Sequence, residues 1–220
     1  MRRIVRPEIL DGDDAPLEEV RESLIDLQRI NRWFGGTSTM QKLIEAVIEK
    51  TSKSHLTLLD VGSASGDIPS SIKNQLNSRG IQLRYTLFDR DATHLADRNN
   101  DCVRGDALAL PFLDNSFDVI GCSLFAHHLE PEQLQAFLKE SLRVCRIGVL
   151  INDLRRSYTH LLAVHAGAPL FGRITRHDSV ASVWRSYTSG EMRTMLNHGT
   201  ARQVDVRHSY LFRMGIIAWK

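Results

Sequence analysis

The chain has 220 residues, of which 42% are hydrophobic and 25% charged, a balance typical of a folded globular protein. Its formal net charge of +2 argues against a dedicated nucleic-acid-binding protein. No apolar run approaches the ~18 residues that a membrane span requires, which argues against a membrane protein.

The first residues, MRRIVRPEIL, are basic but lack the apolar region and the cleavage site of a signal peptide. Cys102, Cys122 and Cys145 show no paired spacing, so we expect buried thiols in a reducing cytosol. The sequence therefore predicts a cytoplasmic protein with no zinc site and no other metal.

Apolar residues at helical spacing predict helices over residues 17–30 and 38–50. HLTLLDVG (55–62) is a continuous apolar run, typical of a strand buried in a parallel sheet. Helices and strands then alternate: helix 67–80, strand 81–89, helix 92–100, strand 102–108, strand 117–124, helix 131–142 and strand 146–153.

The tail follows a different pattern. Residues 154–187 form an irregular insert with one predicted helix at 158–166, and residues 188–199 form a helix with Thr188 and Glu191 in capping-box spacing. Residues 203–220 contain two strands of a hairpin.

This order predicts an α/β fold: a doubly wound, mostly parallel seven-stranded sheet with a C-terminal antiparallel hairpin. Residues 1–50 would form an N-terminal helical lid and residues 51–220 the α/β domain, together a single structural unit.

The turn after the first predicted strand, LLDVGSASGD (58–67), predicts a ligand site. Gly62 and Gly66 lie where a strand leads into a helix, at the edge where such sheets bind ligands. A P-loop is excluded because no Lys-Ser/Thr follows, and the dinucleotide pattern fails at Ala64 and Asp67. Because Asp67 would repel a pyrophosphate at the helix start, we expect a cationic ligand with an amino group.

Taken together, the motifs over about residues 55–153 resemble those of the class I, Rossmann-like S-adenosylmethionine-dependent methyltransferases. LLDVGSASGD is similar to the family's acid-x-Gly-x-Gly-x-Gly motif, with Ala64 in place of the middle glycine. YTLFD, ending in Asp89, GDALALPFLDNSFDVI and SLFAHHL follow in the family's order. More finely, DVGSASGDIP, INDLRRS and TRHDSVASVWRSYTSGEM resemble small bacterial enzymes that modify quinones and polyketides.

The resemblance implies S-adenosylmethionine as cofactor and S-adenosylhomocysteine as product. It implies a cofactor site made of Arg32, Asp60, Gly62, Ser63, Gly66, Asp67, Asp89, Arg90, Asp106, Ala107 and Ser123. Asp89 would accept hydrogen bonds from the ribose hydroxyls, Asp106 would accept one from adenine, and Arg32 would pair with the methionine carboxylate. The simpler alternatives are a turn cap for Asp60, a helix N-cap for Asp89, and solvated side chains for Asp106 and Arg32.

Methyl transfer depends mainly on positioning, and a base matters only when the acceptor must lose a proton. His127 and His128, after the fourth strand, are the candidate catalytic residues. Because adjacent residues rarely face the same way, we expect at most one of them to act. Candidate acceptor-binding residues at the end of the fifth strand and in the insert are Asn152, Arg155, His160, Arg173 and His177, and the alternative for each is a solvated side chain.

The resemblance favours O-methylation of a phenolic or polyketide hydroxyl. Alternatives are C-methylation of an aromatic or quinone ring, and a protein that binds S-adenosylmethionine without transferring methyl, as a cyclase or an assembly partner. We expect a small-molecule acceptor, no nucleic-acid or membrane partner, and a homodimer as an open alternative.

Overall fold

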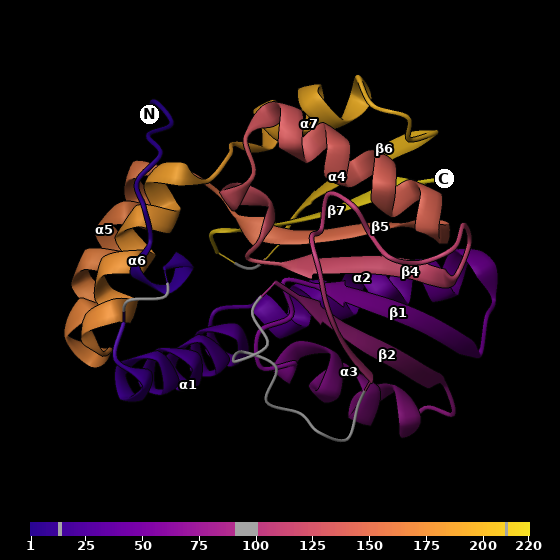
Figure 1. Ribbon diagram of the computed structural model, residues 1–220, viewed down its shortest axis with the longest axis horizontal. Coiled ribbons are helices and arrows are strands. Elements are labelled where there is room, and N and C mark those ends of the chain that lie inside the picture. The colour runs from indigo at the N-terminus through magenta and orange to yellow at the C-terminus, as the bar shows by residue number, and fades with distance from the viewer. Residues whose placement is uncertain (13–14, 91–100, 210) are drawn as a thin grey trace.

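A computed structural model describes residues 1–12, 15–90, 101–209 and 211–220. A seven-stranded sheet lies at its centre in the order β3-β2-β1-β4-β5-β7-β6 (Figure 1). The strands are β1 His55–Val61, β2 Gln82–Asp89, β3 Asp101–Arg104, β4 Phe117–Ser123, β5 Cys145–Leu154, β6 Gln203–His208 and β7 Arg213–Trp219. β1 to β5 run parallel, and β7 runs antiparallel between β5 and β6, which confirms the predicted fold class.

Helices cover both faces of the sheet (Figure 1). The α-helices are α1 Leu17–Trp33, α2 Gly36–Thr51, α3 Asp67–Asn77, α4 Pro131–Val144, α5 Tyr158–Gly167, α6 Arg173–Arg185 and α7 Ser189–Asn197. Short 3₁₀ helices are η1 Ile9–Asp11, η2 Ala126–His128 and η3 Ala168–Leu170. α2 and α3 bury Ile44 and Ile72 against one face, while α4 and α7 bury Phe137 and Met192 against the other. This double cover explains why the central strands are apolar on both sides.

The α1, α5 and α6 helices, together with residues 1–12 (the N-terminal segment), form a cap at one end of the sheet (Figure 1). The cap stands at the carboxyl ends of the parallel strands, because α5 follows directly from β5. The N-terminal segment is fixed along α6: Ile4 N–H donates to Trp184 O at 3.0 Å, and the Asp178 carboxylate accepts from Ile9 and Leu10 N–H at 2.8 and 2.9 Å. Of the predicted lid, α1 belongs to this cap, whereas α2 packs on the sheet against β5 and β7.

The helix α6 was not predicted. It buries the polar side chains of Thr175, Asp178 and Ser182 beside Ile174 and Ala181, so its inward face shows no apolar stripe. The predicted helix at 92–100 lies outside the described residues. In the part of the chain that the structure describes, no helix combines the length and apolar character needed to cross a bilayer.

Candidate active site

A cavity of about 1230 Å³ lies between the cap and the carboxyl ends of β1, β2 and β4. This volume exceeds the ~300–1,000 Å³ of a usual single-ligand site, so it can hold two molecules side by side. The predicted site residues that line it are Asp60, Gly62, Ser63, Asp67, Asp89, Arg90, Asp106, Ala107, Ser123, His127, His128 and His160. The structure therefore brings the candidate cofactor and catalytic residues together in one chamber, except Gly66 and Arg32, which do not line it.

The turn between β1 and α3 needs its small residues. Gly62, Ala64 and Gly66 all have positive φ angles, of 65°, 44° and 66°. A Cβ atom at Gly62 would lie 2.7 Å from the Phe125 ring, too close for any side chain. The turn is tied to the end of β2, since Gly62 N–H donates to Phe88 O at 2.8 Å and Ala64 N–H donates to the Asp89 carboxylate at 3.0 Å. The bare backbone leaves room for a ligand above it.

Three acids surround this turn. Asp60 is 4% exposed, and burial, with the nearby charges of Asp67 and Asp89, raises its pKa to about 8. Such a concentration of acids is relieved by a positive charge, which is what the ammonium and sulfonium groups of the expected cofactor provide. Asp106, the predicted adenine ligand, accepts from Leu108 N–H at 2.9 Å.

A buried arginine faces the acids across the cavity. Arg213, at the start of β7, is 2% exposed, and its Nη2 donates to Asn31 Oδ1 at 3.3 Å. Asn31 Nδ2 in turn donates to the Asp67 carboxylate at 3.2 Å. Arg213 Nη1 has no hydrogen-bond partner among the described residues, and burial lowers the arginine pKa to about 10. Arg213 and Asn31 line the cavity, whereas Arg32, the predicted carboxylate partner, does not.

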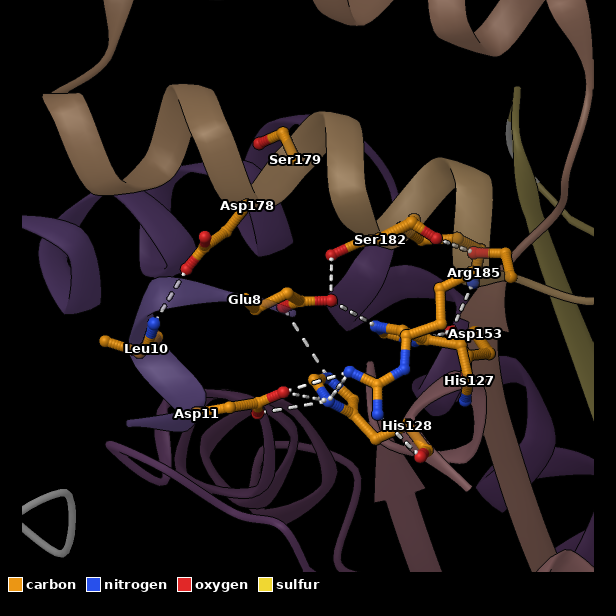
Figure 2. Close-up of polar contacts among 12 residues, drawn as sticks. Glu8, Leu10, Asp11, His127, His128, Asp153, Asp178, Ser179, Ser182 and Arg185 are labelled. Atoms are coloured by element: carbon orange, nitrogen blue, oxygen red, sulfur yellow. Dashed lines mark hydrogen bonds and ion pairs between the residues drawn. The ribbon is translucent and has the colours of Figure 1, made fainter. Parts of the chain in front are cut away.

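His127, which also lines the cavity, is held by Asp153 (Figure 2). The two lie together because β4 and β5 are neighbouring parallel strands whose carboxyl ends meet at one edge. His127 Nδ1 is 2.7 Å from Asp153 Oδ1, and His127 N–H donates to Asp153 Oδ2 at 2.9 Å. His127 Nε2 lies 3.5 Å from Oε1 of Glu8, a residue of the N-terminal segment. Burial alone would lower the pKa of His127, but the carboxylates of Asp153 and Glu8 raise it to about 10.

His128 turns toward the same glutamate (Figure 2). Its Nε2 is 3.7 Å from Glu8 Oε2, and its Nδ1 is 3.2 Å from the Asp11 carboxylate. Arg185 donates to that carboxylate at 2.9 Å and to His128 O at 2.8 Å. The two imidazole centroids are 4.2 Å apart, so the adjacent histidines do not diverge as the sequence led us to expect. The N-terminal segment thus supplies two carboxylates that sequence reasoning missed.

The sequence profile of a family described as "Methyltransferase domain" matches residues 59–151, which hold the glycine turn, Asp89, Asp106 and the histidine pair. The chain carries a class I, S-adenosylmethionine-dependent methyltransferase domain. The cofactor of this methyltransferase is S-adenosylmethionine, and its cavity fits that group. It offers glycine where a Cβ would clash, acids for the cationic end, and for the carboxylate an arginine whose Nη1 has no hydrogen-bond partner in the described part of the chain.

The methyltransferase is similar in fold to solved structures of low identity. The plantazolicin methyltransferase BpumL, solved with a pentazolic desmethylPZN analog and S-adenosylhomocysteine, matches with a TM-score of 0.68 and 13% identity over 96% of this chain and 93% of that one. Human N-acetylserotonin methyltransferase, in complex with S-adenosylmethionine, matches with a TM-score of 0.67 and 13% identity over 98% of this chain and 63% of that one. The CurJ carbon methyltransferase matches with a TM-score of 0.56 and 16% identity over 83% of this chain, which spans only 53% of that one. These likenesses establish the fold alone, and no characterised protein matches significantly in sequence.

The predicted acceptor residues of the methyltransferase are dispersed. His160 lines the cavity, stacks on Phe212 with ring centroids 4.5 Å apart, and has its pKa lowered to about 4 by burial. Asn152 is fully buried below the cavity and donates to Gly36 O and Ser123 Oγ, each at 3.0 Å.

The other three predicted acceptor residues lie outside the cavity lining. Arg155 contacts His208 Nδ1 at 3.0 Å, and Arg173 pairs with Glu19 at 2.7 Å on the surface. His177 contacts the Asp178 carboxylate at 2.7 Å. In their place α6 presents Arg176, Ser179 and Ser182 to the cavity, and α1 presents Leu24 and Leu27.

Proposed function

We propose that this methyltransferase transfers a methyl group to a hydroxyl of a small phenolic or polyketide acceptor. The observation that carries the proposal is the buried His127–Asp153 pair, which opens into the same cavity as the glycine turn and its acids. A histidine that can exchange a proton thus lines the same cavity as the residues proposed to bind the cofactor.

We expect the acids and the arginine of the cavity to contact different parts of the cofactor. Asp89 would bind the ribose hydroxyls, while Arg90, Asp106 and Ala107 would surround the adenine. Asp60 and Asp67 would face the amino group. The role first given to Arg32 passes to Arg213, because the buried Nη1 of Arg213 has no partner among the residues that the structure describes, and a carboxylate is the natural ligand of a guanidinium.

The acceptor would occupy the cap end of the cavity. Leu24, Leu27, Val164 and Phe171 line that end and offer an apolar surface to an aromatic or polyketide body. The similar structures include an N-acetylserotonin methyltransferase and a complex with a pentazolic analog, both consistent with small aromatic acceptors.

The residues around His127 fix its orientation and favour its protonated form. When bound, S-adenosylmethionine supplies a methyl carbon on a positively charged sulfur, ready for in-line displacement. Because the pKa of His127 is about 10, only its unprotonated form can act as the base, and that fraction grows as pH rises. In that form Asp153 binds Nδ1 and Nε2 faces the cavity, where the acceptor O–H would donate its proton as the new O–C bond forms. Asp153 and Glu8 both favour the protonated ring, so they stabilise His127 after it has taken that proton.

Two other functions remain as outcomes of the test. Carbon methylation has the support of the likeness to the CurJ carbon methyltransferase. A protein that binds the cofactor without methyl transfer is the third alternative.

The test is incubation of the purified protein with isotopically labelled S-adenosylmethionine and a panel of phenols and polyketides, with the product located by mass spectrometry and NMR. Label on oxygen supports the proposal, label on carbon supports C-methylation, and no label with bound cofactor supports the third alternative. His127→Ala should lower kcat by about 10²-fold or more with little change in cofactor affinity. His55→Ala, at an exposed histidine far from the cavity, is the matched control and should retain full activity.

A further inference from the structure

We propose that Glu8, His127 and His128 bind a divalent transition-metal cation at the acceptor end of the cavity. The catalytic use of this cation rests on the proposed function, but its binding does not. All three residues line the cavity, so the open coordination positions of a cation would face the acceptor.

The donor atoms already lie close together. One ligand atom from each of the three residues falls within 4.8 Å of the others. His127 Nε2 is 3.5 Å from Glu8 Oε1, and His128 Nε2 is 3.7 Å from Glu8 Oε2. Ligand atoms at ~2.0–2.1 Å from a tetrahedral cation stand roughly 3.3 Å apart, so these two separations need to close by only a few tenths of an ångström.

Each ligand is oriented by a partner of its own (Figure 2). Asp153 holds His127 Nδ1 at 2.7 Å, Asp11 holds His128 Nδ1 at 3.2 Å, and Ser182 Oγ donates to Glu8 Oε1 at 2.8 Å. A carboxylate that binds one ring nitrogen leaves the other nitrogen as a lone-pair donor, which is how metal-ligating histidines are usually supported. Both adjacent histidines therefore have Nδ1 on a carboxylate and Nε2 toward the same glutamate. Asp153, Asp11 and Ser182 form the outer shell around the three ligands.

His127 Nε2 supplies an independent observation. This atom is buried in a side chain that is 2% exposed, and it has no hydrogen-bond partner among the described residues. It interacts with Glu8 Oε1 as an ion pair at 3.5 Å, and a cation between the two atoms would bind both.

The charges around the cluster favour a cation. With neutral imidazole ligands, the carboxylates of Glu8, Asp11 and Asp153 carry three negative charges, and Arg185, the partner of Asp11, carries one positive charge. Arg213, which interacts electrostatically with Asp153, carries a second positive charge, so these groups together sum to −1. Arg3, which donates to His127 O, is itself paired with Glu130 at 2.9 Å and does not alter this balance.

Two imidazoles and one carboxylate with open positions are typical of sites for Zn²⁺ and Fe²⁺. A cation there would bind the acceptor oxygen and lower the pKa of its hydroxyl group. In the metal-bound protein His127 Nε2 would be a ligand and could not also take the acceptor proton, so the hydroxyl proton would leave to solvent instead. The sequence predicted no metal because its cysteines lack ligand spacing and Glu8 is far from the histidines along the chain.

The test is titration of the full chain, freed of metals by a chelator, with Co²⁺ as the probe, followed by visible absorption. We expect one Co²⁺ per chain, with the absorption bands of a low-symmetry nitrogen- and oxygen-ligated site, and displacement of Co²⁺ by Zn²⁺. Glu8→Gln and His128→Ala should each weaken Co²⁺ binding by at least tenfold. Asp11→Asn, which alters only the outer shell, should weaken it by about 10- to 100-fold.

The controls are Glu18→Gln and His55→Ala, at exposed residues away from the cavity, which should bind Co²⁺ like the unchanged protein. Because Glu8 and His128 are not part of the hydrophobic core, the melting temperatures of their variants without metal will show whether the fold is kept. Absence of Co²⁺ uptake, or uptake equal in Glu8→Gln, His128→Ala and the controls, would overturn the metal site.

The metal assay is independent of methyl transfer. Label transfer to a phenol oxygen by chelator-treated protein that takes up no Co²⁺ refutes the metal site and leaves the proposed function standing. Site-specific Co²⁺ uptake in a protein that transfers no methyl group supports the metal site and refutes the proposed function.

Discussion

Replacement of Asp60 by asparagine tests how the protein prepares its site for a cationic ligand. The ordinary pKa of this carboxyl is 3.8, and in the folded protein burial and the charges of Asp67 and Asp89 raise it to about 8. Between these values the folded chain keeps a proton on Asp60 that the unfolded chain has released. The free energy of unfolding therefore falls as pH rises through this window.

The size of the effect follows from the shift. Over the three pH units from 5 to 8, each unit at 1.36 kcal/mol gives an upper limit of about 4 kcal/mol. Because a buried carboxylate is partly relieved by local relaxation and water entry, we expect about 2–4 kcal/mol to be observed. Asparagine keeps the shape of the side chain and removes its ionisation.

The assay is chemical denaturation of Asp60→Asn and the unchanged protein, without cofactor, at several pH values from 5 to 8. The difference between the two free energies of unfolding isolates Asp60 from the other titrating groups, and it should shift by about 2–4 kcal/mol in favour of the variant as pH rises. Calorimetry with S-adenosylhomocysteine, whose amino group is cationic, should show proton release at pH 7 in the unchanged protein and none in the variant. If the free energy of unfolding depends on pH in the same way in both proteins, the reasoning is refuted, because Asp60 would then be ionised before the ligand binds.

Three further substitutions test the cofactor end of the cavity. Asp89→Ala should weaken S-adenosylhomocysteine binding by roughly 1.5–3 kcal/mol in calorimetry, the scale of hydrogen bonds to a charged group, and unchanged affinity would remove Asp89 from the ribose site. Gly62→Ala should lower both the melting temperature and the cofactor affinity, because the new Cβ would lie 2.7 Å from the Phe125 ring. The control is Gly190→Ala, in α7 with open space around it, which should leave both quantities essentially unchanged or slightly improved. Arg213→Gln should weaken binding of S-adenosylhomocysteine but not of 5′-methylthioadenosine, which lacks the carboxylate, and equal losses for both ligands would contradict a carboxylate contact.

The sequence alone determined the sheet and the cofactor turn. Apolar runs of strand length separated by helical patterns indicate a parallel sheet, since both faces of each strand must be buried. The carboxyl ends of parallel strands meet at one edge, so Asp60, Asp89 and His127, each at or just after a strand end, were bound to gather there. Gly62 has a positive φ angle, and the need for glycine at such a turn can be inferred from the sequence without any tertiary contact.

The tertiary structure alone decided what surrounds that edge. Glu8 and Asp11 reach the histidines only because the N-terminal segment is fixed along α6, and α6 itself escaped prediction because it buries polar side chains. Arg213 enters the cavity from an antiparallel strand near the end of the chain, where the only local signal is a single arginine before an apolar run. The spacing of apolar residues indicates which face of a helix or strand packs on the adjacent layer. The charged contacts described here join segments that are far apart in the sequence, so their partners are determined only when the chain folds.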